Sequence, residues 1–128
     1  MTATPYAPGR HAIEAYGGGG FRFAGLSHVG SILATPQGIG ALQAATLAEV
    51  DEAALAPLIA EMDAAPGSIE LLIIGSGATL AHPPAALLAR LRAIGLRFEA
   101  MSTGPAARIY NVLIDERRRV AALLIAVP

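Results

Sequence analysis

The stretch that decides the fold is Ser68–Thr79, which reads Ser-Ile-Glu-Leu-Leu-Ile-Ile-Gly-Ser-Gly-Ala-Thr. Its apolar run, interrupted only by Glu70, is typical of a buried strand in a parallel sheet. The turn Gly75-Ser76-Gly77 follows directly, and a helix-like segment comes after it. In open α/β sheets, ligands bind beside loops at the carboxyl ends of strands, so this turn is the first place to look for a site.

The segments after this turn complete a βαβ unit. Residues 84–94 carry apolar side chains at helical spacing after two prolines, and Gly95 stands where a helix usually ends. Residues 96–101 predict the next strand, and such a crossover is expected to be right-handed. A further helix is expected from Pro105, and the nearly continuous apolar run 120–127 predicts a last strand. The fold class is therefore α/β with some α+β character.

The N-terminal third of the chain predicts strands joined by turns. Residues 11–16 and 21–23 alternate like strands, and the glycine run 17–20 joins them as a flexible hairpin connection. This run lacks the following helix, Lys and Ser/Thr that a phosphate loop needs. Residues 27–35 predict a third strand, whereas residues 37–49 show no clean period and fit either a strand or a loop.

The next segment predicts an amphipathic helix with two possible starting points. Its apolar stripe consists of Leu55, Leu58, Ile59 and Met62. Asp51 could cap the helix, which would then kink at Pro57. Alternatively, the segment from Asp51 is a separate turn and the helix begins at Pro57.

Length and composition limit the organisation of the chain. With 128 residues we expect a loose tail over residues 1–10 and a single domain over residues 11–128. No apolar run approaches the roughly 20 residues of a membrane-spanning helix. A net charge of -1 argues against nucleic acid and anionic membranes as partners. The absence of cysteine and of a secretory signal favours the cytoplasm.

Small polar residues mark two loops as candidates for ligand binding. Around Gly75, Ser76, Gly77 and Thr79, backbone N–H groups and hydroxyls could hold an anion or a small polar molecule. The glycines could instead only allow the chain to leave a buried strand. A dinucleotide is disfavoured, because Leu80 occupies the position of the third glycine in the fingerprint.

The second loop would lie beside the first if the two predicted strands are neighbours. A cleft formed by Ser76, Thr103 and Arg108 would suit a carboxylate or a phosphate. In the alternative interpretation, Thr103 only caps a helix and Arg108 is an ordinary surface residue. The complete set of ligand-binding candidates is Gly75, Ser76, Gly77, Thr79, Ser102, Thr103, Arg108 and Asn111.

The sequence offers no catalytic or metal-binding set. His11, His28 and His82 have no ligand spacing with one another or with a carboxylate. No serine lies in a Gly-x-Ser-x-Gly elbow, and no carboxylate pair can be placed together. We therefore expect no metal, no cofactor and, more readily than not, no enzymatic activity.

The order of several motifs resembles one family of small domains. These motifs are Ile13 with Tyr16, Gly20-Phe21-x-Phe23, Gly30-Ser31-Ile32-Leu33, Leu72-Ile73-Ile74-Gly75-Ser76-Gly77, Tyr110-Asn111-Val112-Leu113 and Arg119-Val120-Ala121-Ala122-Leu123-Leu124. The family groups uncharacterised bacterial and archaeal proteins with the mitochondrial respiratory complex I assembly factor 3 and the adipogenesis-associated domain protein. The resemblance implies three layers: a central mixed sheet with one antiparallel strand, an N-terminal β-rich layer, and helices on the other side.

The resemblance implies no accepted enzymatic activity, and the mitochondrial member binds other proteins while a respiratory complex is built. One hypothesis is therefore a protein-binding, assembly or chaperone-like domain for a respiratory (NADH dehydrogenase) complex. It would be able to self-associate and would reach the inner membrane only through a partner. The alternative is a small-molecule or anion-binding domain, or a weak enzyme. Ser102 and Ile109 stand where relatives commonly carry Asp and Thr, which weakens a catalytic interpretation.

Overall fold

The computed structural model describes residues 7–128. Residues 1–6 of the tail expected over residues 1–10 thus lie outside the described residues. Its next two residues, Ala7–Pro8, form a short strand, β1, which pairs with a later strand of the central sheet. Ala7 is buried in the core. The ordered fold therefore starts before His11.

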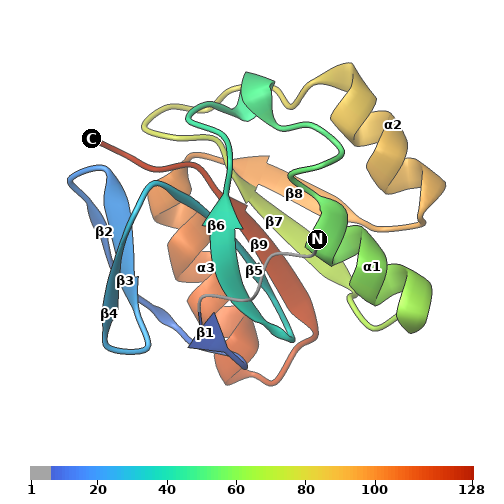
Figure 1. Cartoon of the computed structure of the whole chain (residues 1–128), viewed down its shortest axis with the longest axis horizontal. Coiled ribbons are helices and arrows are strands. Elements are labelled where there is room, and N and C mark those ends of the chain that lie inside the picture. Colours follow the sequence, from blue (N-terminus) through green and yellow to red (C-terminus); the bar gives the residue numbers. More distant parts are fainter. Residues whose placement is uncertain (1–6) are drawn as a thin grey trace.

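A six-stranded mixed sheet forms the centre of the molecule, in the order β1-β6-β5-β9-β7-β8 (Figure 1). Besides β1, its strands are β5 (Ser31–Thr35), β6 (Gly38–Leu42), β7 (Leu71–Gly75), β8 (Phe98–Met101) and β9 (Val120–Leu124). β7 pairs in parallel with both β8 and β9, so the two strands of the expected βαβ unit, whose order the sequence left open, are neighbours. β5 is antiparallel to β9 and β6, and β1 is antiparallel to β6. Two strands, β5 and the short β1, thus run against the other four.

A second, three-stranded antiparallel sheet contains β2 (Ile13–Gly17), β3 (Gly20–Phe23) and β4 (Leu26–Val29). The prediction of a single strand over residues 27–35 is wrong. This segment forms two strands, β4 and β5, which belong to different sheets. The break falls at Gly30, whose φ of 101° is unfavourable for residues with a side chain. Its N–H donates a hydrogen bond to the carbonyl of Gly19 at 2.8 Å.

The two sheets and the helices form three layers, as predicted. The helices α1 (Ala56–Ala64) and α2 (Ala85–Ala93) cover one face of the central sheet, while α3 (Thr103–Asp115) and the small sheet cover the other (Figure 1). Alternate residues of β9 face the two cores: Ala121 and Leu123 face α1 and α2, whereas Ala122 and Leu124 face α3. The sequence did not indicate that α3 shares the layer of the small sheet.

The boundaries of the helices settle the alternatives left by the sequence. Asp51 Oδ1 accepts a hydrogen bond from Ala54 N at 2.9 Å, within a turn that is separate from α1. Pro57 then stands in the first turn of α1, so the second of the two alternatives is correct. Residues 37–49, which the sequence left as either a strand or a loop, contain β6, a turn and a short 3-10 helix, Leu47–Glu49. No helix within residues 7–128 has the length and apolarity needed to span a bilayer.

Candidate functional site

The loop after β7 and the start of α3 lie side by side. Ser76 N donates to the carbonyl of Met101 at 2.8 Å, which continues the pairing of β7 with β8. Thr103 N donates to the carbonyl of Gly77 at 2.9 Å, and Gly77 N donates to Thr103 Oγ1 at the same distance. The two candidate loops are thus joined by reciprocal hydrogen bonds.

The hydroxyl of Thr103 connects three segments of the chain. It accepts a hydrogen bond from Gly77 N and donates one to the carbonyl of Ile125 at 2.7 Å, just beyond β9. Ile125 N in turn donates to the carbonyl of Gly75 at 2.9 Å. Thr103 is completely buried. Its hydroxyl therefore satisfies backbone groups of this structure and does not face the solvent.

The loop after β7 is closed in a similar way. Ser76 Oγ donates to the carbonyl of Thr79 at 2.7 Å and accepts from Ala81 N at 3.0 Å. At Gly75 an added Cβ would lie 3.0 Å from Thr103 Cα and 2.9 Å from Thr103 Oγ1. A glycine at this position therefore allows α3 to approach β7 closely. This geometry favours a structural role for the loop, which was one of the two interpretations of the sequence.

Asn111 has a specific structural partner in the small sheet. Its Oδ1 accepts a hydrogen bond from Ile13 N at 2.8 Å, and its Nδ2 donates to the carbonyl of Ile13 at 2.9 Å. The side-chain amide thus pairs with the first residue of β2 as a neighbouring strand would. Asn111 links the small sheet to α3, and no local signal in the sequence points to a partner 98 positions away.

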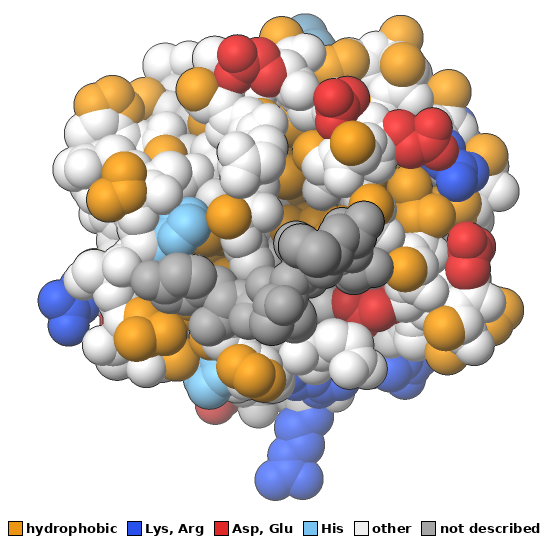
Figure 2. All heavy atoms as spheres, viewed as in Figure 1, with side chains coloured by type: hydrophobic (Ala, Val, Ile, Leu, Met, Phe, Trp, Pro, Cys, Tyr) orange, Lys and Arg blue, Asp and Glu red, His pale blue; other side chains and the backbone are white. Residues whose placement is uncertain are grey.

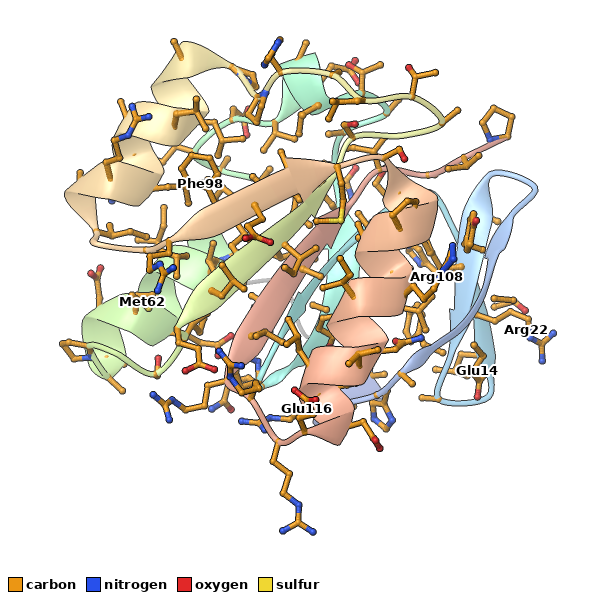
Figure 3. The ribbon with its side chains drawn as sticks, turned by 180° about the vertical axis from the view of Figure 1, so that it is seen from behind. Glu14, Arg22, Met62, Phe98, Arg108 and Glu116 are labelled. Atoms are coloured by element: carbon orange, nitrogen blue, oxygen red, sulfur yellow. The ribbon has the colours of Figure 1, made fainter. Side chains whose placement is uncertain are left out.

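The other two candidates lie at the surface or at a helix end. Ser102 is the N-cap residue of α3, although its side chain makes no capping hydrogen bond. Arg108 is exposed on α3, and within residues 7–128 it forms no ion pair (Figure 3). The structure therefore brings Ser76 and Thr103 into one hydrogen-bonded unit, while the guanidinium of Arg108 lies apart from them.

Titratable groups show few perturbations in this part of the molecule. Burial raises the pKa of Tyr110 to about 12, although the positive charge of Arg10 acts in the other direction and lowers this pKa. The hydrogen bond from Arg118 and its charge hold the pKa of Glu70 below its ordinary value, at the opposite end of β7 from the candidate loops. Among residues 7–128, no three His, Asp or Glu side chains gather in a way that could hold a metal ion.

Glu61 on α1 is the acidic residue whose pKa is raised. Burial is the main cause, and hydrogen bonds to the Thr35 side chain and the Gln37 backbone oppose it. At pH values between the pKa of Glu61 in the unfolded chain and its higher pKa in the folded chain, the folded chain binds more protons than the unfolded chain. The free energy of unfolding therefore falls as the pH rises through this range. We therefore expect the unfolding free energy of the wild type to fall relative to that of Glu61→Gln between about pH 4 and pH 7. Urea titrations at both pH values measure this difference, and a constant difference would contradict it.

A more open site lies between α2 and the segment that precedes α1. This apolar groove has a volume of about 450 Å³, and its lining residues are Val50, Asp51, Glu52, Leu55, Ala86, Leu87, Ala89, Arg90 and Ala93. Glu52 and Arg90 form an ion pair at 2.7 Å. Hydrophobic side chains gather over this part of the surface, next to acidic and basic side chains (Figure 2).

The sequence contained a signal for this groove that the leucine pattern obscured. Ala86, Ala89 and Ala93 are spaced i, i+3 and i+7, so they lie on one side of α2. Alanines on a helix surface leave room for another molecule, because their side chains are short. A search for small residues beside the leucine stripe would have predicted a hollow here.

Comparison with known proteins shows the same fold in several bacteria. An uncharacterized protein of Rhodobacter capsulatus is 40% identical over 124 residues, which cover 97% of this chain and 91% of that protein. The crystal structure of an outer membrane protein from Bartonella henselae has a TM-score of 0.87 and 41% identity, and the match covers 96% of this chain and all of that one.

A more distant structure shows the fold alone. It is the solution structure of a Mth938-like domain from Bordetella pertussis, with a TM-score of 0.75 and 24% identity over 98% of this chain and 91% of that chain. The fold is therefore Mth938-like. The family model described as a protein of unknown function (DUF498/DUF598) matches residues 13–125, which is most of the chain. The chain belongs to the DUF498/DUF598 family.

Proposed function

We propose that this chain is a non-enzymatic protein-binding domain and that the groove beside α2 is its binding surface. The observation that carries the proposal is the shape and chemistry of this groove. Its buried lining residues are Val50, Leu55 and Leu87, and the other lining residues are three alanines and three charged residues. Apolar hollows with a charged margin accept hydrophobic side chains of a partner, while the charges orient it. The Glu52–Arg90 ion pair supplies such a margin.

The competing proposal, an anion or small-molecule site at the loops after β7 and β8, has less support. The hydroxyls of Ser76 and Thr103 are both occupied by backbone partners. A ligand that used these hydroxyls would have to break hydrogen bonds on which the loop depends. Arg108 remains as an exposed cation on α3, but one guanidinium on a helix surface provides little specificity.

The proposed partner is a component of a respiratory NADH dehydrogenase complex during its assembly. Support comes from the resemblance to the family of complex I assembly factor 3. We place the domain in the cytoplasm, attached peripherally to the inner membrane through this partner. The Bartonella henselae relative is described as an outer membrane protein. Fractionation of cells into cytoplasm, inner membrane and outer membrane tests this location.

The test uses two alanines of the same helix. Ala89 lines the groove, whereas Ala85 is exposed on α2 outside it. The tagged wild-type chain should capture NADH dehydrogenase subunits from detergent-solubilised bacterial membranes. Ala89→Arg should reduce their recovery about tenfold, which corresponds to ~1.4 kcal/mol of binding. Ala85→Arg should leave it unchanged, and quantitative mass spectrometry measures all three.

Two outcomes would contradict the proposal. If Ala89→Arg recovers the same subunits as the wild type, the groove is not the binding surface. If repeated captures with the wild type recover no NADH dehydrogenase subunit, the proposed partner is wrong. Both variants should fold, because neither change removes a large core side chain. Circular dichroism of the variants checks that their helix content is unchanged.

A further inference from the structure

We infer that the outer face of α3 is a self-complementary surface that binds a second copy of this chain in the antiparallel direction. The outer face of α3 comprises Arg108, Ile109, Val112, Asp115 and Glu116. It lies on the opposite side of the central sheet from the groove beside α2. A dimer formed in this way would therefore leave both grooves open.

The middle of this face is apolar and open to solvent. Val112 is 53% exposed and Ile109 is 38% exposed. The opposite side of α3 already supplies the core with Ala106, Ala107 and Tyr110. Val112 thus leaves more than half of its surface open to solvent, and Ile109 leaves more than a third. Two such side chains at the centre of a helix surface are suited to contact with another apolar surface.

Charges of opposite sign flank this apolar centre. Arg108 precedes Val112 by one turn, and Asp115 and Glu116 follow it by about one turn. Arg108 and Asp115 are seven residues apart and therefore lie on nearly the same line along the helix, about 10 Å from each other. Within residues 7–128, neither forms an ion pair. Figure 3 shows Arg108 beside the middle of α3 and Glu116 at its C-terminal end.

This arrangement matches itself when it is turned end for end. With a two-fold axis close to Val112, Arg108 of each copy faces Asp115 of the other, so the same attraction occurs twice. The valines meet at the centre. A parallel arrangement would instead place equal charges together.

The surface beside Asp115 offers space for the incoming side chain. A recess of about 510 Å³ there is lined by Arg10, Ala12, Asn111, Val112, Ile114 and Asp115. Its apolar walls can cover the aliphatic part of the second copy's Arg108, as long basic side chains commonly pack. Arg10 at the same recess repels that guanidinium, while Asp115 attracts it. The balance predicts a moderate affinity that decreases with salt.

Charge reversal tests the pairing directly. Sedimentation velocity over a range of concentrations should show a monomer–dimer equilibrium for the wild type. Arg108→Glu and Asp115→Arg should each weaken dimerisation by roughly tenfold or more, because each replaces two attractions with two repulsions. The double variant, with both changes, should restore the wild-type affinity. Both positions are exposed, so loss of folding is not expected.

Cross-linking tests the register of the two helices. The chain contains no cysteine, so Val112→Cys introduces a single thiol. Because the two copies meet at this position, oxidised glutathione should convert the variant into a disulfide-linked dimer at low micromolar protein concentration. Val29→Cys is the matched control, since Val29 is 87% exposed on β4, and it should cross-link much more slowly.

The inference is overturned by any of four results. The wild type could remain monomeric at millimolar concentration, the double charge reversal could fail to restore dimerisation, or the two cysteine variants could cross-link at equal rates. Dimers that persist in both single charge variants would show that the second copy binds elsewhere. Capture of the NADH dehydrogenase partner by variants of α3 is expected to remain normal, so this inference and the proposed function fail independently.

Discussion

Replacing Thr103 with valine is expected to lower the free energy of unfolding by roughly 2 to 5 kcal/mol. The hydroxyl is completely buried, and it satisfies both Gly77 N and the carbonyl of Ile125. Valine has a similar shape but cannot replace either hydrogen bond, so two backbone groups would remain buried without a partner. The loss would separate the loop after β7, the start of α3 and the chain after β9.

The matched control for this change is Thr103→Ser. Serine retains the hydroxyl and removes one methyl group, so it should cost only about 1 kcal/mol. Urea denaturation of the three proteins, followed by circular dichroism, measures both effects. If valine is tolerated as well as serine, the hydroxyl does not stabilise the fold. A role in ligand binding would then become the better explanation for Thr103.

Asn111→Leu is expected to destabilise the fold by about 1 to 3 kcal/mol and to loosen the small sheet selectively. Leucine has a similar size but leaves Ile13 N and the Ile13 carbonyl without their partners on α3. The central sheet does not depend on this contact. Hydrogen exchange should therefore accelerate in β2, β3 and β4 while remaining nearly unchanged in β7 and β9.

Asn111→Asp separates the two halves of this contact. The carboxylate can still accept from Ile13 N, but it repels the Ile13 carbonyl that the amide group contacts at 2.9 Å. Its effect should be close to that of leucine at neutral pH and smaller when the carboxyl is protonated. Uniform acceleration of exchange across the whole molecule would contradict a local role for Asn111.

Local patterns in the sequence predicted the parts of the fold that depend on local physics. The apolar run that became β7, the leucine spacing of α2 and the prolines at helix starts each specify one element without reference to the rest. The parallel pairing of β7 with β8 followed from the crossover. Strand order did not follow, because it depends on which distant faces pack together. The sequence thus left open the insertion of β9 between β5 and β7.

At the candidate site, too, local features could be predicted from the sequence and contacts between distant residues could not. The sequence correctly suggested that Ser76 and Thr103 lie close together, since both follow neighbouring strands. It could not show that the Thr103 hydroxyl binds backbone atoms, because its partners Gly77 and Ile125 lie 26 and 22 positions away in the chain. Similarly, the residues around Gly30 have continuous strand character, although the chain passes from one sheet to the other at this glycine, whose φ is positive.

The position of β9 in the sheet has a consequence for the order in which the fold can form during synthesis. β9 lies between β5 and β7 and hydrogen-bonds to both, although the ribosome makes it after every other strand and helix of the described structure. Before β9 is made, the β5–β6 and β7–β8 pairs have no strand between them. The central sheet can therefore be completed only after β9 has been made, and the edges of β5 and β7 that pair with it stay without their partner strand until then.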